Sequence, residues 1–571
     1  MSLGLLLLAY FCLLQPISVV FSSRHLNLTT VISVDSKEEE EYFLYFKHLP
    51  NKSPLDRYLH SPRRLYLLCK AAEFAAQNYK GAKEENKFTL RHILSLRNVQ
   101  DNRAFKYRLL LQDYQTGEQH TADFAIFTVP TNVGGKYRVR VEAMKQKRSD
   151  VVENQNEPCD RLSRAANCSS CGYRGICHKG TAGITPWLAL ALKTQRKLQV
   201  NMSLGRVQML AAHNAFNNRA DGYGELDDCH WPPPYNSECI VLANQEFSFT
   251  DLLRMGIRAL EIDPWWCFGK VRMSHALNHA YLGCGPWDRE FKDGIKEIAE
   301  WSKRSENQNE VIRLYLEDGP AHTQGHDALL NGPIKEHFGE KVLTPDDIHT
   351  YFNGKWPTLY EMQKTGKTVL ISSGNSYIHK GEYIHRGYWK ELTTNRFLAY
   401  KNCTEAVTSS AEPLRVYSDS TEYGPFWNGP KKTGTILNYM EYLKCGVVYP
   451  AADQINPDLL NTAVFTWARN EPSEKLSRQS CVVLCAGDGR WHLQQCATKN
   501  PYACVSTIND SIETKWVISS TKGPYYEPAC PEGFVFSVPR NAVEHYKLLK
   551  DMNRQDIWLN LKHYIPLIIE E

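Results

Sequence analysis

The stretch at residues 256–266, GIRALEIDPWW, predicts a short apolar strand that carries two acidic side chains. Glu261 and Asp263 stand two positions apart, so on a strand both carboxylates leave the same face and can share one cation. Three more apolar runs end in polar residues: AAHNAF at 211–216, KVRMSHA at 270–276 and EVIRLYLEDG at 310–319. These strand ends predict one shared site.

The polar residues at these ends favour metal-assisted chemistry on a phosphodiester. Their oxygen donors suit a hard cation, Ca²⁺ or else Mg²⁺, whereas zinc usually recruits imidazole or thiolate. The donors are Asn214, Glu261, Asp263 and Glu317. His213 and His275 are then left for proton transfer. A phosphodiester needs a cation against its charge, a base for the attacking hydroxyl and an acid for the leaving oxygen.

From about residue 185 the pattern alternates between strand-like and helix-like runs. VQMLAAH at 207–213 is followed by the helix-like SFTDLLRMG at 248–256, and REFKDGIKEIAEWSK at 289–303 precedes VIRLYLE at 311–317. Such alternation predicts a parallel sheet of the β/α (TIM-type) barrel class. These barrels keep their active sites at the carboxyl ends of the strands, where the polar residues fall.

The order of these motifs resembles the catalytic X region of phosphatidylinositol-specific phospholipase C and its relatives. The shared order is His-Asn, Gly-Ile-Arg-x-Leu-Glu-x-Asp, a second His and then Leu-Glu. The likeness covers roughly residues 200–470, and later segments resemble those of secreted single-barrel members: FGEKVLTPDD at 338–347, WPTLYEM at 356–362 and GKTVLISSG at 366–374. The resemblance implies that the four oxygen donors are metal ligands and that His213 and His275 are catalytic.

The resemblance also implies how the chain differs from other branches of that superfamily. Bacterial members work without metal and place an arginine where calcium would sit, so the acidic pair in LEID favours the metal-dependent branch. The chain lacks a match to the second half-barrel pattern and to the lipid-targeting domain of the intracellular signalling enzymes. The implied substrate is a phospholipid or a glycolipid anchor at a membrane surface.

Several alternatives stay open at this point. A phospholipase D-like or sphingomyelinase D-like enzyme would use a similar histidine pair and acidic site on the same barrel. A non-catalytic protein that binds glycans or lipids is a third reading. Within SHALNHA, His279 is the rival of His275. Lys270 and Arg272 flank the second histidine and are candidate ligands of the substrate phosphate, although exposed strand residues would look the same.

Residues 1–23 have the apolar core and small residues of a secretory signal peptide, with an uncleaved anchor as the alternative. Removing them takes away Cys12 and leaves sixteen of the seventeen cysteines, an even number that predicts disulfides in a secreted protein. Cys267 with Cys284, and Cys229 with Cys239, are expected to brace loops near the site.

Sequons for N-glycosylation fit secretion: Asn27, Asn167, Asn201, Asn402 and Asn509.

A chain of 571 residues exceeds one ordinary domain, and its composition divides it further. After the signal we expect a β-rich accessory domain at 24–155, a Cys-rich segment at 156–184 and the barrel at 185–470. Residues 471–571 form a disulfide-rich α+β module that resembles the closing half of a C-type lectin-like fold and is a candidate glycan binder. The net charge of +4 is too small to indicate a nucleic-acid partner.

Overall fold

The computed structural model divides the chain into two compact units, residues 1–156 and 157–571. Five strands are described in the first unit, by their backbone. In the second unit the described residues are 167–171, 176–223, 240–267, 270–274, 288–317, 327–374, 382–386, 390–399, 403, 413–419, 422–423, 434–473, 479–507 and 515–561. Among the described residues, no helix is both long and apolar enough to span a bilayer.

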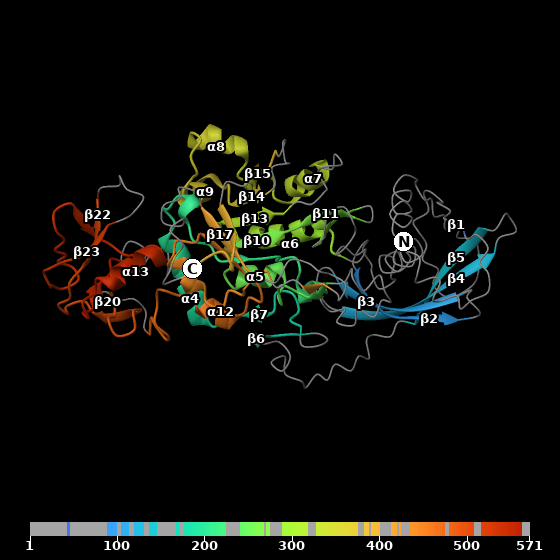
Figure 1. Cartoon of the computed structure of the whole chain (residues 1–571), viewed down its shortest axis with the longest axis horizontal. Coiled ribbons are helices and arrows are strands. Elements are labelled where there is room, and N and C mark those ends of the chain that lie inside the picture. The colour runs from blue at the N-terminus through green and yellow to red at the C-terminus, as the bar shows by residue number, and fades with distance from the viewer. Residues whose placement is uncertain are drawn as a thin grey trace. The chain divides into compact units, whose positions relative to one another are not determined.

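The first unit contains a five-stranded antiparallel sheet in the order β1-β5-β4-β3-β2. Its strands, blue in Figure 1, are β1 (Phe43–Tyr45), β2 (Phe88–Val99), β3 (Ala104–Asp113), β4 (Gln119–Pro130) and β5 (Lys136–Lys145). The four longer strands are joined in sequence order, as in a meander. The assignment of residues 24–155 as one accessory domain stays a prediction.

The second unit is built on eight parallel strands. They are β8 (Ala211–Ala212), β10 (Ala259–Ile262), β13 (Ile312–Leu316), β14 (Val369–Ser373), β15 (His385–Arg386), β16 (Lys390–Thr393), β17 (Leu414–Tyr417) and β19 (Tyr449–Ala452). Their order in the sheet is β15-β14-β13-β10-β8-β19-β17-β16. The first strand therefore pairs with the last, with Ala212 opposite Ala452. This is the cyclic neighbour order of a β/α barrel, with a seam between β15 and β16 in the described residues.

Helices precede, separate and follow these strands in the sequence, as the alternating pattern predicts. They are α4 (Pro186–Leu198), α5 (Phe249–Arg254), α6 (Phe291–Lys303), α7 (Asp327–His337), α8 (Pro345–Phe352), α9 (Leu359–Thr365), α11 (Tyr439–Leu443) and α12 (Pro457–Asn461). Short 3₁₀ turns are η3 (Leu204–Arg206), η4 (Arg219–Asp221), η6 (Ser305–Asn307) and η8 (Gly339–Lys341). Helices α8 and α9 each start with a capping box, Thr344 with Asp347 and Thr358 with Glu361. Figure 1 shows α5 and α6 beside the strands β10 and β13.

Alternate residues of the barrel strands face two different cores. Leu260 and Leu314 pack in the large cluster that also contains the helices α4, α5 and α6. Ala259 and Leu370 pack in the second cluster, together with Tyr449. Because side chains alternate along a strand, the residues two and four positions after Ala259 continue the face of the second cluster. This alternation sets the direction of Glu261 and Asp263.

Two short antiparallel strand pairs, one of them a hairpin, stand outside the parallel sheet. Strand β11 (Pro264–Cys267) pairs antiparallel with β12 (Lys270–Met273), and β9 (Ile240–Leu242) pairs with β18 (Glu422–Tyr423). The prediction that KVRM is a barrel strand is therefore wrong. Two residues between β11 and β12 suffice for a hairpin, whereas a parallel neighbour needs a crossover of a dozen or more.

The C-terminal segment, defined here as residues 479–561 and drawn red in Figure 1, holds two three-stranded antiparallel sheets. One contains β20 (Ser480–Leu484), β21 (Trp491–Gln495) and β25 (Ile557–Trp558), and the other contains β22 (Ala503–Ser506), β23 (Trp516–Ile518) and β24 (Phe534–Phe536). Helix α13 (Ala542–Lys550) lies between β24 and β25 in the sequence, and Cys481–Cys496 and Cys504–Cys530 are disulfides. Its lectin-like character stays a prediction.

Other disulfides fit an extracellular or secreted protein. Cys403 bonds to Cys445, and Cys168 bonds to Cys177 beside the small β6 (Asn167–Cys168) and β7 (Ala182–Gly183) pair. The expected pairs Cys229–Cys239 and Cys267–Cys284 lie outside the side chains that the structure describes, as does the signal peptide.

Candidate active site

The acidic residues predicted from the sequence meet at the carboxyl ends of neighbouring strands. Glu261 lies within β10, Asp263 follows it, and Glu317 follows β13, which pairs with β10. One carboxylate oxygen from each of the three lies within 4.8 Å of the others. Glu261 and Asp263 are buried, and Glu317 is exposed. The acidic group is therefore shielded from solvent at Glu261 and Asp263 and accessible at Glu317, where a substrate could reach a bound cation.

Glu261 is fixed by contacts to only one of its two oxygens. Its Oε2 accepts a hydrogen bond from the backbone N–H of Asn214 at 3.2 Å and another from Arg415. Among the described residues, neither Glu261 Oε1 nor Asp263 Oδ1 has a hydrogen-bond partner, although both atoms are buried. Buried anionic oxygens are costly unless they are paired or bound to a metal. These two atoms fit a cation held between the strands.

Asn214 is placed for the same site by a left-handed backbone conformation. Its φ is 42° at the second residue after β8, a region that asparagine tolerates better than most residues. Its side-chain Nδ2 donates to Asn244 Oδ1 at 3.3 Å, which orients the amide group. The amide Oδ1 of Asn214 is the fourth oxygen donor expected for a hard cation.

The electrostatics of the acidic group also favour a cation. Burial is the largest cause that raises the pKa of Asp263 well above its ordinary value, and the neighbouring charges of Glu317 and Glu261 raise it further. Burial likewise raises the pKa of Glu261, against the opposing effect of Arg415. Close carboxylates repel each other's ionised forms. A divalent cation would remove that repulsion, and the donor set fits Ca²⁺ or Mg²⁺.

Arg415, in β17, contributes a positive charge that the sequence did not reveal. Its guanidinium bonds to Glu261 and lies 2.9 Å from Glu391 Oε1. The rings of Tyr315 and Tyr417 flank it, with centroids 4.5 and 4.7 Å from its Cζ. Arg415 thus balances one carboxylate of the acidic group. Among the described residues, Asp263 and Glu317 have no ion pair, so Arg415 balances only part of the charge of the acidic group.

His213 forms a buried pair with an aspartate from the last barrel strand. Its Nδ1 lies 2.8 Å from Asp453 Oδ1, and its Nε2 lies 3.9 Å from Glu261 Oε2. The imidazole stacks on Tyr417 with a centroid distance of 5.3 Å. Asp419, after β17, also offers a carboxylate within 4.8 Å of these two residues. The contact with Asp453 orients Nε2 toward the acidic group.

The charge state of His213 follows from these neighbours. Burial alone lowers the pKa of the imidazole, but the carboxylates of Asp453 and Glu261 outweigh it and raise the pKa to about 10. His213 is therefore cationic at neutral pH when the acidic group holds no metal. A bound cation would offset the field of Glu261 and lower the pKa of His213 toward its ordinary value.

The remaining predicted residues stand at positions 270–279 of the sequence, on the β11–β12 hairpin and after it. His275 and its rival His279 lie outside the described residues. Lys270 bonds to Glu290, and Arg272 is buried and donates to the backbone oxygen of Asp288 at 2.6 Å. Both belong to the β11–β12 hairpin. Their role as ligands of the substrate phosphate stays a prediction.

Three residues of the site were missed by sequence reasoning: Arg415, Asp419 and Asp453. Each has a usable signal, because Arg415 and Tyr417 alternate in β17, Asp419 continues that spacing after the strand, and Asp453 directly follows the apolar YPAA. The rule that found Glu261 and Asp263, polar residues at an apolar strand end, also applies to LRVYSD and YPAAD. To apply this rule, LRVYSD and YPAAD must first be assigned to the last strands of the barrel.

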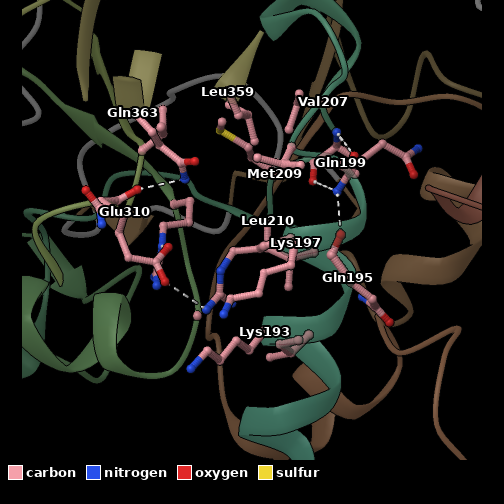
Figure 2. A pocket seen from close by; sticks show the side chains of 18 of the residues that line it. Lys193, Gln195, Lys197, Gln199, Val207, Met209, Leu210, Glu310, Leu359 and Gln363 are labelled. Carbon is pink, nitrogen blue, oxygen red and sulfur yellow. Dashed lines mark hydrogen bonds and ion pairs between the residues drawn. The ribbon is translucent and has the colours of Figure 1, made fainter. Parts of the chain in front are cut away.

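A cavity of about 310 Å³ lies at the other end of the strands (Figure 2). It is lined by residues that precede β8, β10 and β13, among them Leu210, Arg258 and Glu310. Glu310 bonds to Arg258 at 2.8 Å and to Arg196 at 3.3 Å. Burial would raise the pKa of Glu310, but the two arginines lower it. The amino-terminal end of a β/α barrel serves stability, and this network fits that role.

Comparisons with known proteins give distant relatives. No protein-family model matches the chain. Two proteins of Mycobacterium tuberculosis, the uncharacterized protein Rv2075c of strain H37Rv and the uncharacterized protein MT2135 of strain CDC 1551, are each 24% identical over 401 residues, which is 62% of this chain and 79% of theirs. The maintenance of telomere capping protein 6 of Candida tropicalis is 30% identical over 115 residues, 19% of this chain and 18% of that protein.

Among solved structures, the chain is similar to S. officinalis PLC21. The identity is 12% and the TM-score is 0.26, with 60% of this chain and 48% of the other covered. A TM-score at that level carries no argument about fold or activity. The strand order and the side-chain geometry described above therefore carry the functional argument.

Proposed function

We propose that this protein is a secreted, metal-dependent phosphoric diester hydrolase of the phospholipase C type. The observation that supports this most is the acidic group of Glu261, Asp263 and Glu317 beside the His213–Asp453 pair, at one edge of the parallel sheet. Diester cleavage needs a cation site and a proton carrier within reach of the same phosphorus. The two groups adjoin each other, because Glu261 Oε2 lies 3.9 Å from His213 Nε2.

The metal would be held by the oxygens of Asn214, Glu261, Asp263 and Glu317. When bound, Ca²⁺ or Mg²⁺ supplies charge neutralisation for the phosphate and lowers the pKa of a hydroxyl that it contacts. Glu261 Oε1 and Asp263 Oδ1 are buried and have no hydrogen-bond partner in the described part of the chain, which is the observation in favour of this assignment.

His213 would move the proton. Because Asp453 accepts the hydrogen bond from Nδ1, Nε2 is the atom that gains and loses the catalytic proton. In its cationic form the imidazole donates toward the negative charge that develops on the phosphate, and in its neutral form it accepts a hydroxyl proton. Tyr417, stacked on the ring, restricts its rotation.

Arg415 would hold Glu261 in place. Its bond to Oε2, together with the N–H of Asn214, fixes one oxygen of the carboxylate and leaves Oε1 for the cation. His275 would be the second proton carrier, as the resemblance to phospholipase C implies. The substrate would be a phospholipid or a glycolipid anchor, and a bound hydroxyl of its headgroup or a water molecule would attack phosphorus.

The test is to incubate the purified protein with a panel of phospholipids, lysophospholipids and sphingomyelin, and to identify the products by mass spectrometry. Parallel reactions contain Ca²⁺, Mg²⁺ or a chelator. We expect metal-dependent diacylglycerol and a phosphorylated headgroup, absent from His213→Ala and Glu261→Gln. Glu300→Gln is the matched control, since Glu300 is an exposed acid on α6.

Each alternative predicts a different result in the same assay. Phosphatidic acid or ceramide phosphate would assign the barrel to the phospholipase D-like class. If His213→Ala has the turnover of the wild type, the histidine pair is not catalytic and the proposal is wrong.

A further inference from the structure

The C-terminal segment contains another cluster of side chains that could bind a metal ion. The chemical types of its ligands differ from those of the barrel site. Cys485, Asp488 and His492 each place one ligand atom within 4.8 Å of the other two. The cluster combines a thiol, a carboxylate and an imidazole. Such mixed sulfur and nitrogen sets select Zn²⁺ and similar transition metals, not the hard cations that suit the barrel.

A β-hairpin brings these residues together. Strands β20 and β21 pair with Val483 opposite His492, and Cys485 follows two positions after Val483. The turn between them is closed by backbone bonds from Cys485 N to Arg490 O and from Gly489 N to Cys485 O, both at 2.9 Å. Because alternate residues of a strand share a face, Cys485 and His492 lie on the same side of the hairpin.

The atoms around the cluster are already oriented by other groups. Asp488 Oδ1 accepts from the N–H of Arg490 at 2.9 Å, while its Oδ2 lies 2.8 Å from His492 Nε2. The backbone N–H of Gly487 donates to Cys485 Sγ at 3.4 Å. Metal ligands are commonly held by such outer hydrogen bonds.

A second carboxylate faces the other nitrogen of the imidazole. Glu471 Oε1 lies 3.8 Å from His492 Nδ1, and its Oε2 accepts from the N–H of Ser473 at 2.9 Å. A histidine that binds metal through one nitrogen usually gives its other N–H to a carboxylate. In His492, Nε2 faces Asp488 and Nδ1 faces Glu471 at a distance longer than a hydrogen bond, so a small shift of Glu471 would complete that arrangement.

The state of Cys485 agrees with a ligand role. It forms no disulfide in the described part of the chain, where Cys481, Cys496, Cys504 and Cys530 of the same segment are all paired. Its side chain is partly exposed. An accessible thiol in a disulfide-bonded protein is open to oxidation, and a bound metal would protect it.

We infer that Cys485, Asp488 and His492 bind a transition-metal ion, with Zn²⁺ as the best fit, and that Glu471 orients His492. Three protein ligands leave a fourth tetrahedral position for water or another ligand. Zinc contacts of about 2.0–2.3 Å require a small contraction of the turn 485–490 around the ion. This site is independent of the proposed phosphodiesterase activity.

The test is cobalt binding by the full-length protein. The protein is stripped with a chelator and titrated with Co²⁺, and absorption is recorded for the charge-transfer band of a cobalt thiolate. This band reports a sulfur ligand, so the oxygen donors of the barrel do not contribute. We expect a band at one equivalent of Co²⁺, lost when Zn²⁺ is added in equal amount.

Variants decide whether the named residues hold the ion. Cys485→Ser and His492→Ala should abolish the band. Glu471→Gln should weaken Co²⁺ binding by about 10- to 100-fold. The controls Asp551→Asn and Glu261→Gln should retain the band. Near-UV circular dichroism checks the fold, and His492→Gln replaces any variant that fails to fold. The inference is overturned if wild type with a reactive Cys485 thiol gives no band, if Cys485→Ser keeps the band, or if peptide mapping finds Cys485 in a disulfide.

Discussion

His213 and Asp453 stand 240 residues apart in the sequence, yet their Nδ1 and Oδ1 atoms are 2.8 Å apart. The contact follows from the pairing of the first and last barrel strands, which sets Ala212 opposite Ala452. The next residue of each strand therefore emerges at the same edge. Gln245 strengthens the junction, since its Nε2 donates to the backbone oxygens of His213 and Ala452 at 2.7 and 2.8 Å.

Asp453→Asn should lower the turnover of the diester by about 10²-fold or more, because proton transfer by an oriented imidazole contributes about 10²- to 10⁴-fold. The amide can no longer balance the imidazolium charge. The measurement is kcat and KM on the substrate found in the lipid panel, with kcat falling more than KM rises. Asp458→Asn, an exposed acid on α12, is the control. Unchanged kcat in Asp453→Asn would mean that the pair is structural.

Metal should stabilise the protein through the acidic group. At a free Ca²⁺ or Mg²⁺ concentration of 100 times Kd, the expected gain is about 2.7 kcal/mol, measured as a higher Tm. Asp263→Asn should lose most of that gain. In chelator the same variant should be at least as stable as the wild type, because burial and like charge raise the pKa of Asp263. An equal metal-induced rise in Tm for both proteins would contradict the site.

Much of this fold could be predicted from local patterns. The alternation of apolar strands and amphipathic helices indicated a parallel sheet, and the acidic pair at the end of ALEID located the site, because the period of two puts both carboxylates on one face. The hairpin β11–β12 was mistaken for part of the barrel, since KVRM has the composition of a buried strand. Its two-residue connection was the contrary signal.

The parts that could not be predicted depend on contacts between distant segments. Arg415 reaches Glu261 only because β17 and β10 belong to one sheet, so the alternation in LRVYSD marks one face of a strand but not the carboxylate that Arg415 contacts. The even number of cysteines predicts disulfides, and four are present among the described residues, where Cys485 is unpaired. A count of cysteines fixes neither the partners nor the exceptions.

Arg415→Met should destabilise the metal-free protein strongly, by about 3–5 kcal/mol, because it leaves the buried carboxylate of Glu261 without its guanidinium partner. Glu261→Gln in the same chain should restore much of the loss. Unfolding by urea of the two single variants and the double variant gives the coupling energy. Arg396→Met, on the exposed side of the barrel, is the control. Additive effects of the two substitutions would show that the ion pair contributes little.

The stability of the metal-free protein should fall as the pH rises from about 6.5 to about 10. The folded-state pKa of His213 is raised to about 10, although burial opposes it, whereas the unfolded imidazole keeps its ordinary value of 6.5. The stabilisation is therefore complete below about pH 6.5 and is lost as the pH approaches the folded value, with a slope of up to about 1.4 kcal/mol per pH unit.

Asp263 also has a raised pKa and contributes a slope of the same sign, so a single pH curve cannot isolate the histidine. The difference between wild type and His213→Gln isolates it, measured by urea unfolding in chelator from pH 6 to pH 9. The glutamine variant should have the shallower curve. Saturating Ca²⁺ or Mg²⁺ should reduce the difference between the two, since the cation offsets the field of Glu261 at Nε2. Parallel curves in chelator would show that His213 is neutral in the folded protein and that Asp453 serves only to orient it.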